Sequence, residues 1–229
     1  MRTGLMGVIA LAGLAQVASA QVTYNDSTFD VFDNPPDSPY DHLDISSVVV
    51  SHDASNIYFT INVRGNADNR DWAKFCIGID TGAVGGDAGN GWGRNVSWSG
   101  QGIDFWVGSW VDGGGGAELR GAPGWGLLAA TYNSDPTIGQ SFNGTRTERS
   151  VTLSRALLGL NGNDTFRFDV ITTGGGADPG VDHLSNAAMA TPNWGTTSNA
   201  GEFLSYTIPS PGAAALLGLG GLIVGRRRR

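Results

Sequence analysis

The stretch Asn56-Ile-Tyr-Phe-Thr-Ile-Asn-Val-Arg64 alternates apolar and polar side chains at every second position. That period places Ile57 and the apolar residues after it on one face of an extended strand, with the polar side chains on the other. The turn-forming segment Asp53-Ala-Ser-Asn56 separates this strand from a second apolar-rich stretch at residues 45–51. The sequence therefore predicts an antiparallel β-hairpin over residues 45–64.

The same two-residue period recurs along the chain, and no stretch between residues 21 and 207 sustains a helical period of 3.6. We expect one helical turn at residues 154–160, ended by Gly162, and further strands at residues 75–79, 103–112, 117–120, 127–132, 150–153, 165–172 and 203–207. Short strands with Gly-rich connections predict one all-β domain at residues 21–207. Its expected fold is a single antiparallel β-sandwich of jelly-roll or immunoglobulin-like type.

The composition of the 229-residue chain excludes several classes of protein. Its 36 Gly follow no Gly-X-Y period, which excludes collagen, and its 7 Trp and 9 Phe are too many for a disordered chain. A single Cys excludes an intramolecular disulfide and a Cys-based zinc cluster. With 14 Lys and Arg against 21 Asp and Glu, the net charge of −7 argues against a nucleic-acid partner.

Residues 1–20 have the features of a secretory signal peptide. Arg2 gives a short basic start, residues 5–17 form an apolar run, and Ala18-Ser19-Ala20 matches a small-residue cleavage site. We therefore expect an N-terminal signal helix that signal peptidase removes, so that the mature chain begins at Gln21. A buried N-terminal helix is the alternative.

Residues 208–229 form a second terminal signal. Pro209-Ser210-Pro211 precedes an apolar run at residues 212–225, and four basic residues follow: Arg226, Arg227, Arg228 and Arg229. As a helix the 14-residue run spans about 21 Å, which is short of the ~30 Å hydrocarbon core of a bilayer. We therefore expect a short apolar helix held transiently in the inner membrane, with its Arg residues on the cytoplasmic side. A plain C-terminal membrane anchor is the alternative.

This tail resembles the PEP-CTERM sorting signals of Gram-negative-type bacteria. It shares their Pro-x-Pro start, short Leu- and Gly-rich helix and terminal Arg run, although the usual Pro-Glu-Pro is Pro209-Ser210-Pro211 here. The resemblance implies that an exosortase recognises and removes the tail. It also implies that the body reaches the cell surface or the extracellular polysaccharide matrix.

Catalytic motifs are mostly missing from the sequence. No H-E-x-x-H, G-x-S-x-G or phosphate-binding loop occurs, and the three His residues, His42, His52 and His183, lie far apart along the chain. A two-carboxylate glycosidase would need Asp partners for its few Glu residues, and no local motif marks such a pair. We therefore expect a non-catalytic protein, with a hydrolase as the alternative.

The strand at residues 103–112 carries the strongest candidate binding site. If its apolar residues face the core, two Trp and two Asp share the opposite face: Asp104, Trp106, Trp110 and Asp112. The two Trp would then stand about 13 Å apart, the length of two or three sugar rings. Aromatic faces stack on pyranose rings and carboxylates accept hydrogen bonds from hydroxyls, so this face predicts a carbohydrate-binding site.

The alternative is a strand buried on both faces, with both Trp in the core and Gly108 making room for them. The next candidate platforms are Trp92 and Trp98 in the Gly-rich loop at residues 81–102, and Trp125 in a later Gly-rich stretch. A loop of that length in a compact domain is usually functional or mobile.

Acidic residues recur every three or four positions near the start of the body, at Asp26, Asp30, Asp33, Asp37, Asp41 and Asp44. Three Pro residues between positions 35 and 39 prevent a helix, so these carboxylates lie on an extended or looping segment. Carboxylate oxygens on a loop suit Ca²⁺. The candidate ligands are Asp30, Asp33, Asp37 and, beside another Gly-rich stretch, Asp80. A solvated acidic face without a metal is the alternative.

Several segments resemble family-nine-like carbohydrate-binding modules, and the glucodextranase C-terminal domain is similar in outline. The matching segments are Asp44-Ile45 and residues 56–61, 75–82, 150–154, 157–160 and 166–170. The resemblance implies a β-sandwich that binds sugars with aromatic side chains and often holds structural Ca²⁺.

Together these features predict an exported, exosortase-sorted protein of the cell surface or extracellular matrix that associates with polysaccharide without catalysis. Its expected partners are extracellular polysaccharide, the two processing enzymes and, transiently, the inner membrane. A purely structural matrix protein without a sugar site is the main alternative, and a glycoside-active hydrolase is the lesser one.

Overall fold

The computed structural model describes residues 21–33, 39–67, 70, 72–83 and 85–209. In these residues the chain forms two large antiparallel sheets, so the predicted all-β sandwich is confirmed. The helices expected at residues 1–20 and 212–225 lie outside the described residues. So do the predicted cleavage residues Ala18 and Ala20 and the sorting residues Ser210, Pro211 and Arg226 to Arg229.

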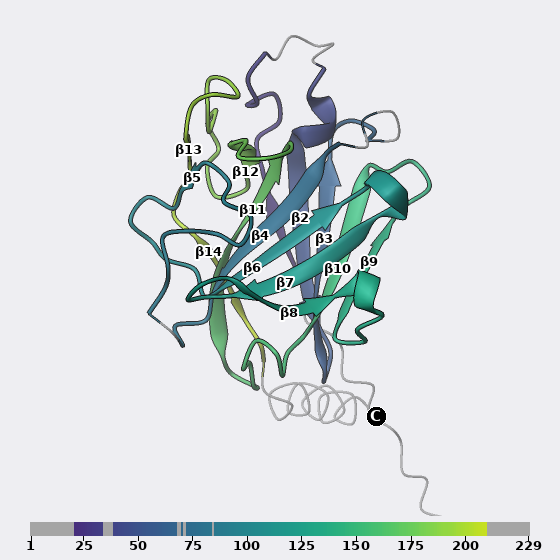
Figure 1. The fold of residues 1–229 in the computed structure, drawn as a ribbon, viewed down its shortest axis with the longest axis vertical. Coiled ribbons are helices and arrows are strands. Elements are labelled where there is room, and N and C mark those ends of the chain that lie inside the picture. Colours follow the sequence, from purple (N-terminus) through teal and green to yellow (C-terminus); the bar gives the residue numbers. More distant parts are fainter. Residues whose placement is uncertain (1–20, 34–38, 68–69, 71, 84, 210–229) are drawn as a thin grey trace, which may run out of the picture. The chain divides into compact units, whose positions relative to one another are not determined.

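The first sheet has five strands in the order β1-β2-β3-β10-β9 (Figure 1). Their bounds are β1 Gln21–Asn25, β2 Ile45–His52, β3 Asn56–Val63, β9 Ile138–Phe142 and β10 Glu148–Ser154. The predicted β2–β3 hairpin is present, and Asp53 fixes its turn because Oδ1 accepts the backbone N–H groups of Ser55 and Asn56, both at 2.7 Å.

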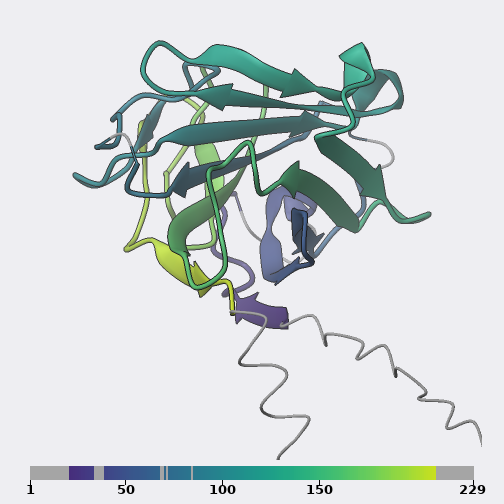
Figure 2. The ribbon, with the colours of Figure 1, turned by 90° about the horizontal axis from the view of Figure 1, so that it is seen from below.

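The second sheet follows the order β12-β11-β4-β6-β7-β8, with β14 paired to the first half of β11. Its strands are β4 Lys74–Asp80, β6 Phe105–Trp110, β7 Gly116–Gly121, β8 Gly126–Ala130, β11 Thr165–Thr173, β12 Gly180–His183 and β14 Leu204–Thr207. A short parallel pair joins β5 (Val96–Ser97) to β13 (Ser198–Asn199), and three 3-10 turns are η1 Asp41–Leu43, η2 Asp112–Gly114 and η3 Thr131–Asn133. Figure 2 shows the teal strands of this sheet above the blue strands β2 and β3 of the first.

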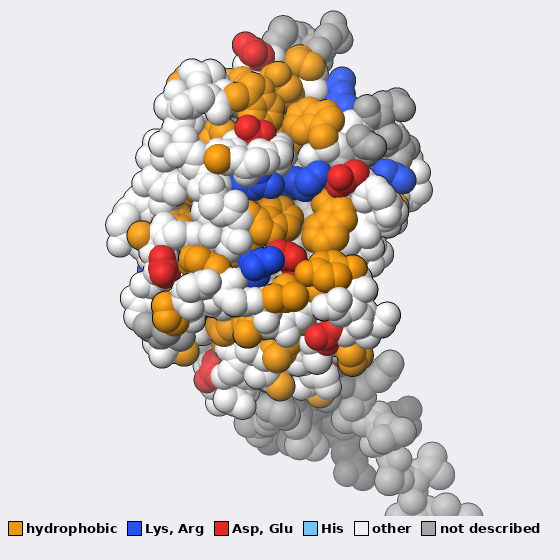
Figure 3. Space-filling view, viewed as in Figure 1, with side chains coloured by type: hydrophobic (Ala, Val, Ile, Leu, Met, Phe, Trp, Pro, Cys, Tyr) orange, Lys and Arg blue, Asp and Glu red, His pale blue; other side chains and the backbone are white. Residues whose placement is uncertain are grey.

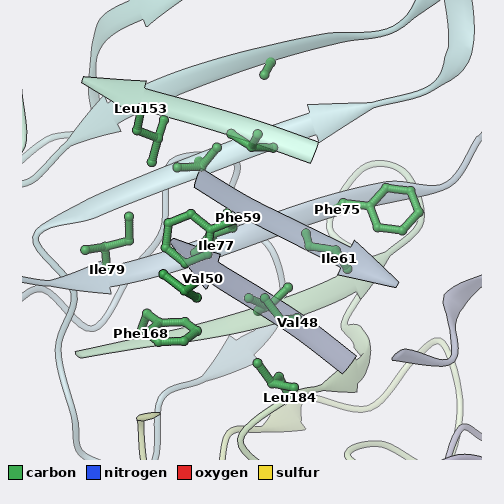
Figure 4. Close-up of a cluster of buried hydrophobic side chains, with 14 of the residues drawn as sticks. Val48, Val50, Phe59, Ile61, Phe75, Ile77, Ile79, Leu153, Phe168 and Leu184 are labelled. Carbon is green, nitrogen blue, oxygen red and sulfur yellow. The ribbon is translucent and has the colours of Figure 1, made fainter. Parts of the chain in front are cut away.

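The core lies between the two sheets and follows the predicted alternation. Val48, Val50, Phe59 and Ile61 of the first sheet meet Phe75, Ile77, Ile79 and Phe168 of the second (Figure 4). Each of these side chains is at most 2% exposed. The hydrophobic surface that this burial removes from water is the main source of the fold's stability.

The structure adds strands that the sequence pattern did not predict: β1, β5, β9, β12 and β13. Of these, β5 and β13 have only two residues each, and β12 reads Gly-Val-Asp-His and is buried throughout. The turn after β10 ends at Gly159, where φ is +68°, and not at Gly162 as predicted. Gly is the residue that adopts this left-handed conformation without strain.

Candidate functional site

The predicted sugar-binding face of β6 is mostly covered. Trp106 does point away from the main core, but the Gly-rich loop folds over it and buries it completely; Trp98 of that loop is 2% exposed. Both indoles belong to a second apolar cluster on the outer side of the second sheet, together with Cys76, Ile103 and Phe203. The prediction of Trp106 and Trp98 as sugar platforms is therefore wrong, because neither ring presents a face to a ligand.

The two predicted acidic partners have other roles. Asp104 is fully buried, and its Oδ2 accepts the Thr81 backbone N–H at 2.9 Å, the Thr81 hydroxyl at 2.8 Å and the Ala83 N–H at 3.2 Å. It fixes the start of the covering loop, so its prediction as a sugar ligand is also wrong. Asp112 stays half-exposed at the end of β6, where it pairs with Lys74 Nζ at 2.9 Å.

Three partly exposed aromatic side chains form a continuous row on this face, which we call the aromatic strip: Trp92, Trp110 and Tyr132. The ring centroids of Trp92 and Trp110 are 6.1 Å apart, and those of Trp110 and Tyr132 are 6.2 Å apart. Tyr132 is 57% exposed. Of the predicted platforms, Trp92 and Trp110 are thus brought together, and Tyr132 joins them from the turn after β8.

Two glycines lie directly beneath the indole rings of the aromatic strip. A Cβ on Gly108 of β6 would lie 2.1 Å from Cζ2 of Trp92, and a Cβ on Gly116 of β7 would lie 2.1 Å from Cζ2 of Trp110. Real Cβ atoms do not approach so closely, so only Gly allows each indole to rest against the strand backbone. The alternative in which Gly108 makes room for Trp106 and Trp110 differs from the structure, where the indole against Gly108 is Trp92.

Glu118 of β7 is the polar centre of the strip. Its Oε1 accepts the indole N–H of Trp92 and the Nε–H of Arg120, both at 2.5 Å, and its Oε2 accepts the hydroxyl of Tyr132 at 3.1 Å. Burial of Glu118 opposes its ionisation, but the hydrogen bonds from Arg120 and Trp92 outweigh it and lower the pKa of the carboxyl. The carboxylate therefore fixes the orientation of two of the three rings.

Charged side chains adjoin the rings on this face of the molecule. The Arg94 guanidinium lies 5.1 Å from the Trp92 ring centroid, and Arg120 Nη1 also donates to the Trp125 carbonyl at 3.1 Å. Figure 3 shows orange, blue and red side chains interspersed over the side that β6 and β7 present in Figure 1. Aromatic faces beside a few oriented polar groups suit a hydroxyl-rich ligand. The sequence analysis did not identify Tyr132 or Glu118 as site residues. The alternation of Glu118 with Arg120 could have indicated that both side chains lie on the same face of β7.

A second candidate site is a group of carboxylates, which we call the acidic centre: Asp26, Asp30, Asp44 and Asp182. One oxygen from each of Asp30, Asp44 and Asp182 lies within 4.8 Å of the others. Asp26 adjoins them closely enough that its charge raises the pKa of Asp182. Sequence spacing identified Asp30 but not Asp182, which comes from the unpredicted strand β12.

Burial is the main cause of altered ionisation in the acidic centre. It raises the pKa of Asp26 to about 8 and that of Asp30 to about 6, and it raises the pKa of Asp182 well above the usual range. Repulsion from neighbouring carboxylates adds to burial at each of these groups. The four acids therefore share a site in which negative charge is poorly compensated.

The other predicted metal ligands do not join this group. Asp33 is exposed, and Asp80 pairs with Arg167, whose Nε lies 3.1 Å from Oδ2. Neither belongs to the group of three carboxylates whose oxygens converge. Asp37 lies outside the described residues.

Asp169, His183 and Ser198 form a hydrogen-bonded chain that resembles a hydrolase triad in its geometry. His183 Nδ1 lies 2.7 Å from Asp169 Oδ2, and His183 Nε2 lies 2.9 Å from Ser198 Oγ. All three side chains have no exposed surface, so a substrate has no access to the serine oxygen. The chain instead connects β11, β12 and β13 as a buried polar network.

The sequence matches no protein-family model, and no curated protein sequence is significantly similar to it. None of the helical segments within the described residues has the length and hydropathy that a bilayer-spanning helix requires.

Proposed function

We propose that this protein is exported, sorted by an exosortase and held at the cell surface or in the extracellular matrix, where it associates with polysaccharide without catalysis. The aromatic strip of Trp92, Trp110 and Tyr132 is the surface that binds the sugar chain. The observation that carries this proposal is the row of half-exposed rings oriented by a buried carboxylate, Glu118.

The strip has the chemistry that carbohydrate requires. Its consecutive ring spacings of 6.1 and 6.2 Å are comparable to the width of one pyranose ring. Because the rings are tilted by 45° and 36° relative to one another, they follow a twisted chain better than a flat one. Arg94, Arg120 and Asp112 at the edges supply donors and acceptors for hydroxyl groups.

The structural-matrix alternative requires the Trp residues to be needed inside the fold. Trp98 and Trp106 meet that condition, but Trp92 and Trp110 keep exposed surface, and Trp72 is 37% exposed. Aromatic surface left in water is costly unless a ligand covers it. This partial exposure favours a binding surface over a purely structural role.

Affinity electrophoresis of the full chain through gels that contain the exopolysaccharide of the producing bacterium tests the proposal. We expect retardation of the wild-type protein and an affinity about tenfold weaker for the double variant Trp110→Ala/Tyr132→Ala, which corresponds to a loss of about 1.4 kcal/mol. Tyr58→Ala is the matched control, because Tyr58 is a half-buried aromatic residue on the outer face of the first sheet. Its retardation should equal that of the wild type.

The contrary outcomes are distinct. No retardation of the wild type removes polysaccharide binding and favours the structural alternative. If Trp110→Ala/Tyr132→Ala is still retarded but Trp72→Ala is not, the sugar-binding site lies at a second aromatic group instead. In that group the ring centroids of Trp72 and Trp194 are 5.8 Å apart.

A further inference from the structure

We propose that the acidic centre binds one divalent cation of the hard, oxygen-preferring class, Ca²⁺, through Asp30, Asp44 and Asp182, with Asp26 beside them. This inference goes beyond polysaccharide binding and does not depend on it. It would give the fold a cation-dependent connection between the segment after β1, the start of β2 and strand β12.

The spacing of the carboxylate oxygens fits a single ion. Protein oxygens lie 2.3–2.6 Å from a bound Ca²⁺, so two ligands of the same ion are at most about 5 Å apart. The oxygens contributed by Asp30, Asp44 and Asp182 meet that limit, since all lie within 4.8 Å of one another. Three carboxylates that converge this closely are in position to coordinate one cation.

The second observation is an unpartnered oxygen on a fully buried side chain. Asp44 has no exposed surface; its Oδ2 accepts the Phe29 N–H at 2.9 Å and Arg64 Nε at 2.7 Å. Its Oδ1 has no hydrogen-bond partner within the described part of the chain. A buried carboxylate oxygen without a donor is costly, and a cation coordinated by Asp44 Oδ1 would remove that cost.

The neighbouring acids also have buried oxygens without hydrogen-bond donors. Both oxygens of Asp30 and Oδ2 of Asp26 are buried and unpartnered among the described residues. Asp182 differs, because its Oδ2 accepts the Ile45 N–H at 2.6 Å and its Oδ1 accepts the His183 N–H at 2.8 Å. Those two bonds fix the Asp182 carboxylate in place and leave lone pairs for an ion, since each carboxylate oxygen can accept more than one bond.

The charge balance favours a divalent ion. The acidic centre brings together four carboxyl groups, and among the described residues Arg64 is the basic side chain that forms an ion pair with it, at Asp44. A carboxylate-only donor set suits hard cations such as Ca²⁺ and is unsuited to soft metals, which prefer Cys and His. A bound ion would favour the ionised form of these carboxyl groups, which burial and mutual repulsion oppose.

Calorimetric titration and thermal unfolding of the metal-stripped full chain test the inference, with CaCl₂ and MgCl₂ as the probes. We expect saturable Ca²⁺ binding with one site. At a free Ca²⁺ concentration about a hundred times its Kd, the Tm should rise by about 5–10 °C. Mg²⁺ should bind more weakly, because it demands tighter octahedral geometry.

Asp30→Asn is the decisive variant, because neither oxygen of Asp30 makes a hydrogen bond within the described structure that the substitution would break. We expect a Kd for Ca²⁺ at least tenfold weaker and a Tm in the metal-free state that is higher than that of the wild type, since one repelling charge is gone. Asp33→Asn is the matched control: Asp33 is exposed and three residues away, and its removal should leave both quantities unchanged.

A wild-type Tm that Ca²⁺ does not change, or an Asp30→Asn variant that binds Ca²⁺ as tightly as the wild type, overturns the inference. Equal weakening by Asp30→Asn and Asp33→Asn also overturns it, because that pattern reports general acidity of the surface. These measurements contain no polysaccharide, so failure of the cation site and failure of sugar binding are separately visible.

Discussion

His183 Nδ1 lies 2.7 Å from Asp169 Oδ2 inside the protein, and both side chains have no exposed surface. The other oxygen of Asp169 accepts the Ser185 N–H at 3.0 Å, and Ser198 Oγ, next to His183 Nε2, accepts the Gly180 N–H at 2.9 Å. These bonds hold the segment at residues 180–199 against β11. Ala200 and Phe203, which follow this segment in the chain, belong to the cluster around Trp98.

Asp169→Ala should lower the free energy of unfolding by about 3–5 kcal/mol, because it leaves the His183 ring and the Ser185 N–H without their buried acceptor. Ser198→Ala should lower it by about 1–3 kcal/mol, since only bonds of a neutral hydroxyl are lost. Urea unfolding measures both. In the same samples, a serine-directed phosphonate should not label Ser198. Labelling of Ser198, or an Asp169→Ala variant as stable as the wild type, would contradict a structural role.

Gly108→Ala should disturb the aromatic strip without replacing any of its three aromatic residues. The new Cβ would meet Trp92 at 2.1 Å, so the indole must move and its bond to Glu118 must break. We expect a loss of about 1–3 kcal/mol in unfolding free energy and weaker retardation in polysaccharide gels. Tryptophan fluorescence should report the displaced ring.

Gly126→Ala is the control for that prediction. Gly126 also lies in the second sheet, on the edge strand β8, and a Cβ there would meet nothing within 4 Å. It should leave stability and retardation near the wild-type values. Equal effects of the two substitutions would show that loss of a strand glycine, and not contact with Trp92, is responsible.

The strands with a clear two-residue period could be predicted from the sequence, and β3 is the best example because every second side chain enters the core. The period also showed correctly that Trp106 points away from that core. It could not show that the loop before β6 returns over the same face, because loop placement depends on long-range packing. Trp106 was therefore proposed as an exposed platform, with a strand buried on both faces as the alternative, and it is fully buried.

The ligands of the acidic centre, too, could be predicted only in part from the sequence. The spacing of acids after β1 drew attention to Asp30, but spacing within one loop does not reveal which carboxylates meet in space. Asp182 lies far along the chain in β12, an edge strand of the second sheet without apolar alternation, and only the tertiary fold brings it close to Asp30. Sequence reasoning thus identified the type of site and part of one ligand set, and tertiary structure supplied the rest.

Arg149 joins the two sheets and should be a sensitive position for stability. The side chain extends from β10 and is 1% exposed. Its Nε donates to Ser109 Oγ of β6 at 2.9 Å, and its Nη2 donates to the Gly116 carbonyl of β7 at 2.7 Å. Burial lowers the pKa of its guanidinium to about 10. Arg149→Met keeps an unbranched side chain but leaves these acceptors unpaired, so we expect a loss of about 2–4 kcal/mol in urea unfolding.

Arg167→Met is the comparison for Arg149→Met. Arg167 is half-exposed and pairs with Asp80 at the surface, where such a pair contributes about 0–1 kcal/mol. A loss of similar size in both variants would contradict a special role for the buried guanidinium.

His42 should make the stability of the fold depend on pH. Its ring is fully buried, and Nδ1 lies 3.1 Å from Nη1 of Arg70, which can only donate, so Nδ1 must carry a lone pair. Burial, and then the Arg70 charge, lower the pKa of His42 to about 4, although Asp41 acts in the opposite direction. The ring is therefore neutral in the folded protein at pH values where an unfolded His is already protonated.

The sign of the effect follows from that difference. In the unfolded chain His42 takes up a proton near pH 6.5, while in the folded protein it does so only near pH 4. His42 therefore stabilises the fold above pH 6.5, and this contribution is lost as the pH falls toward 4. The slope is at most about 1.4 kcal/mol per pH unit. His42→Gln can still accept from Arg70 but does not titrate. The difference in unfolding free energy between wild type and His42→Gln should therefore become smaller as the pH falls from 6.5 to 4. A difference that stays constant across that range would show that His42 does not titrate as described.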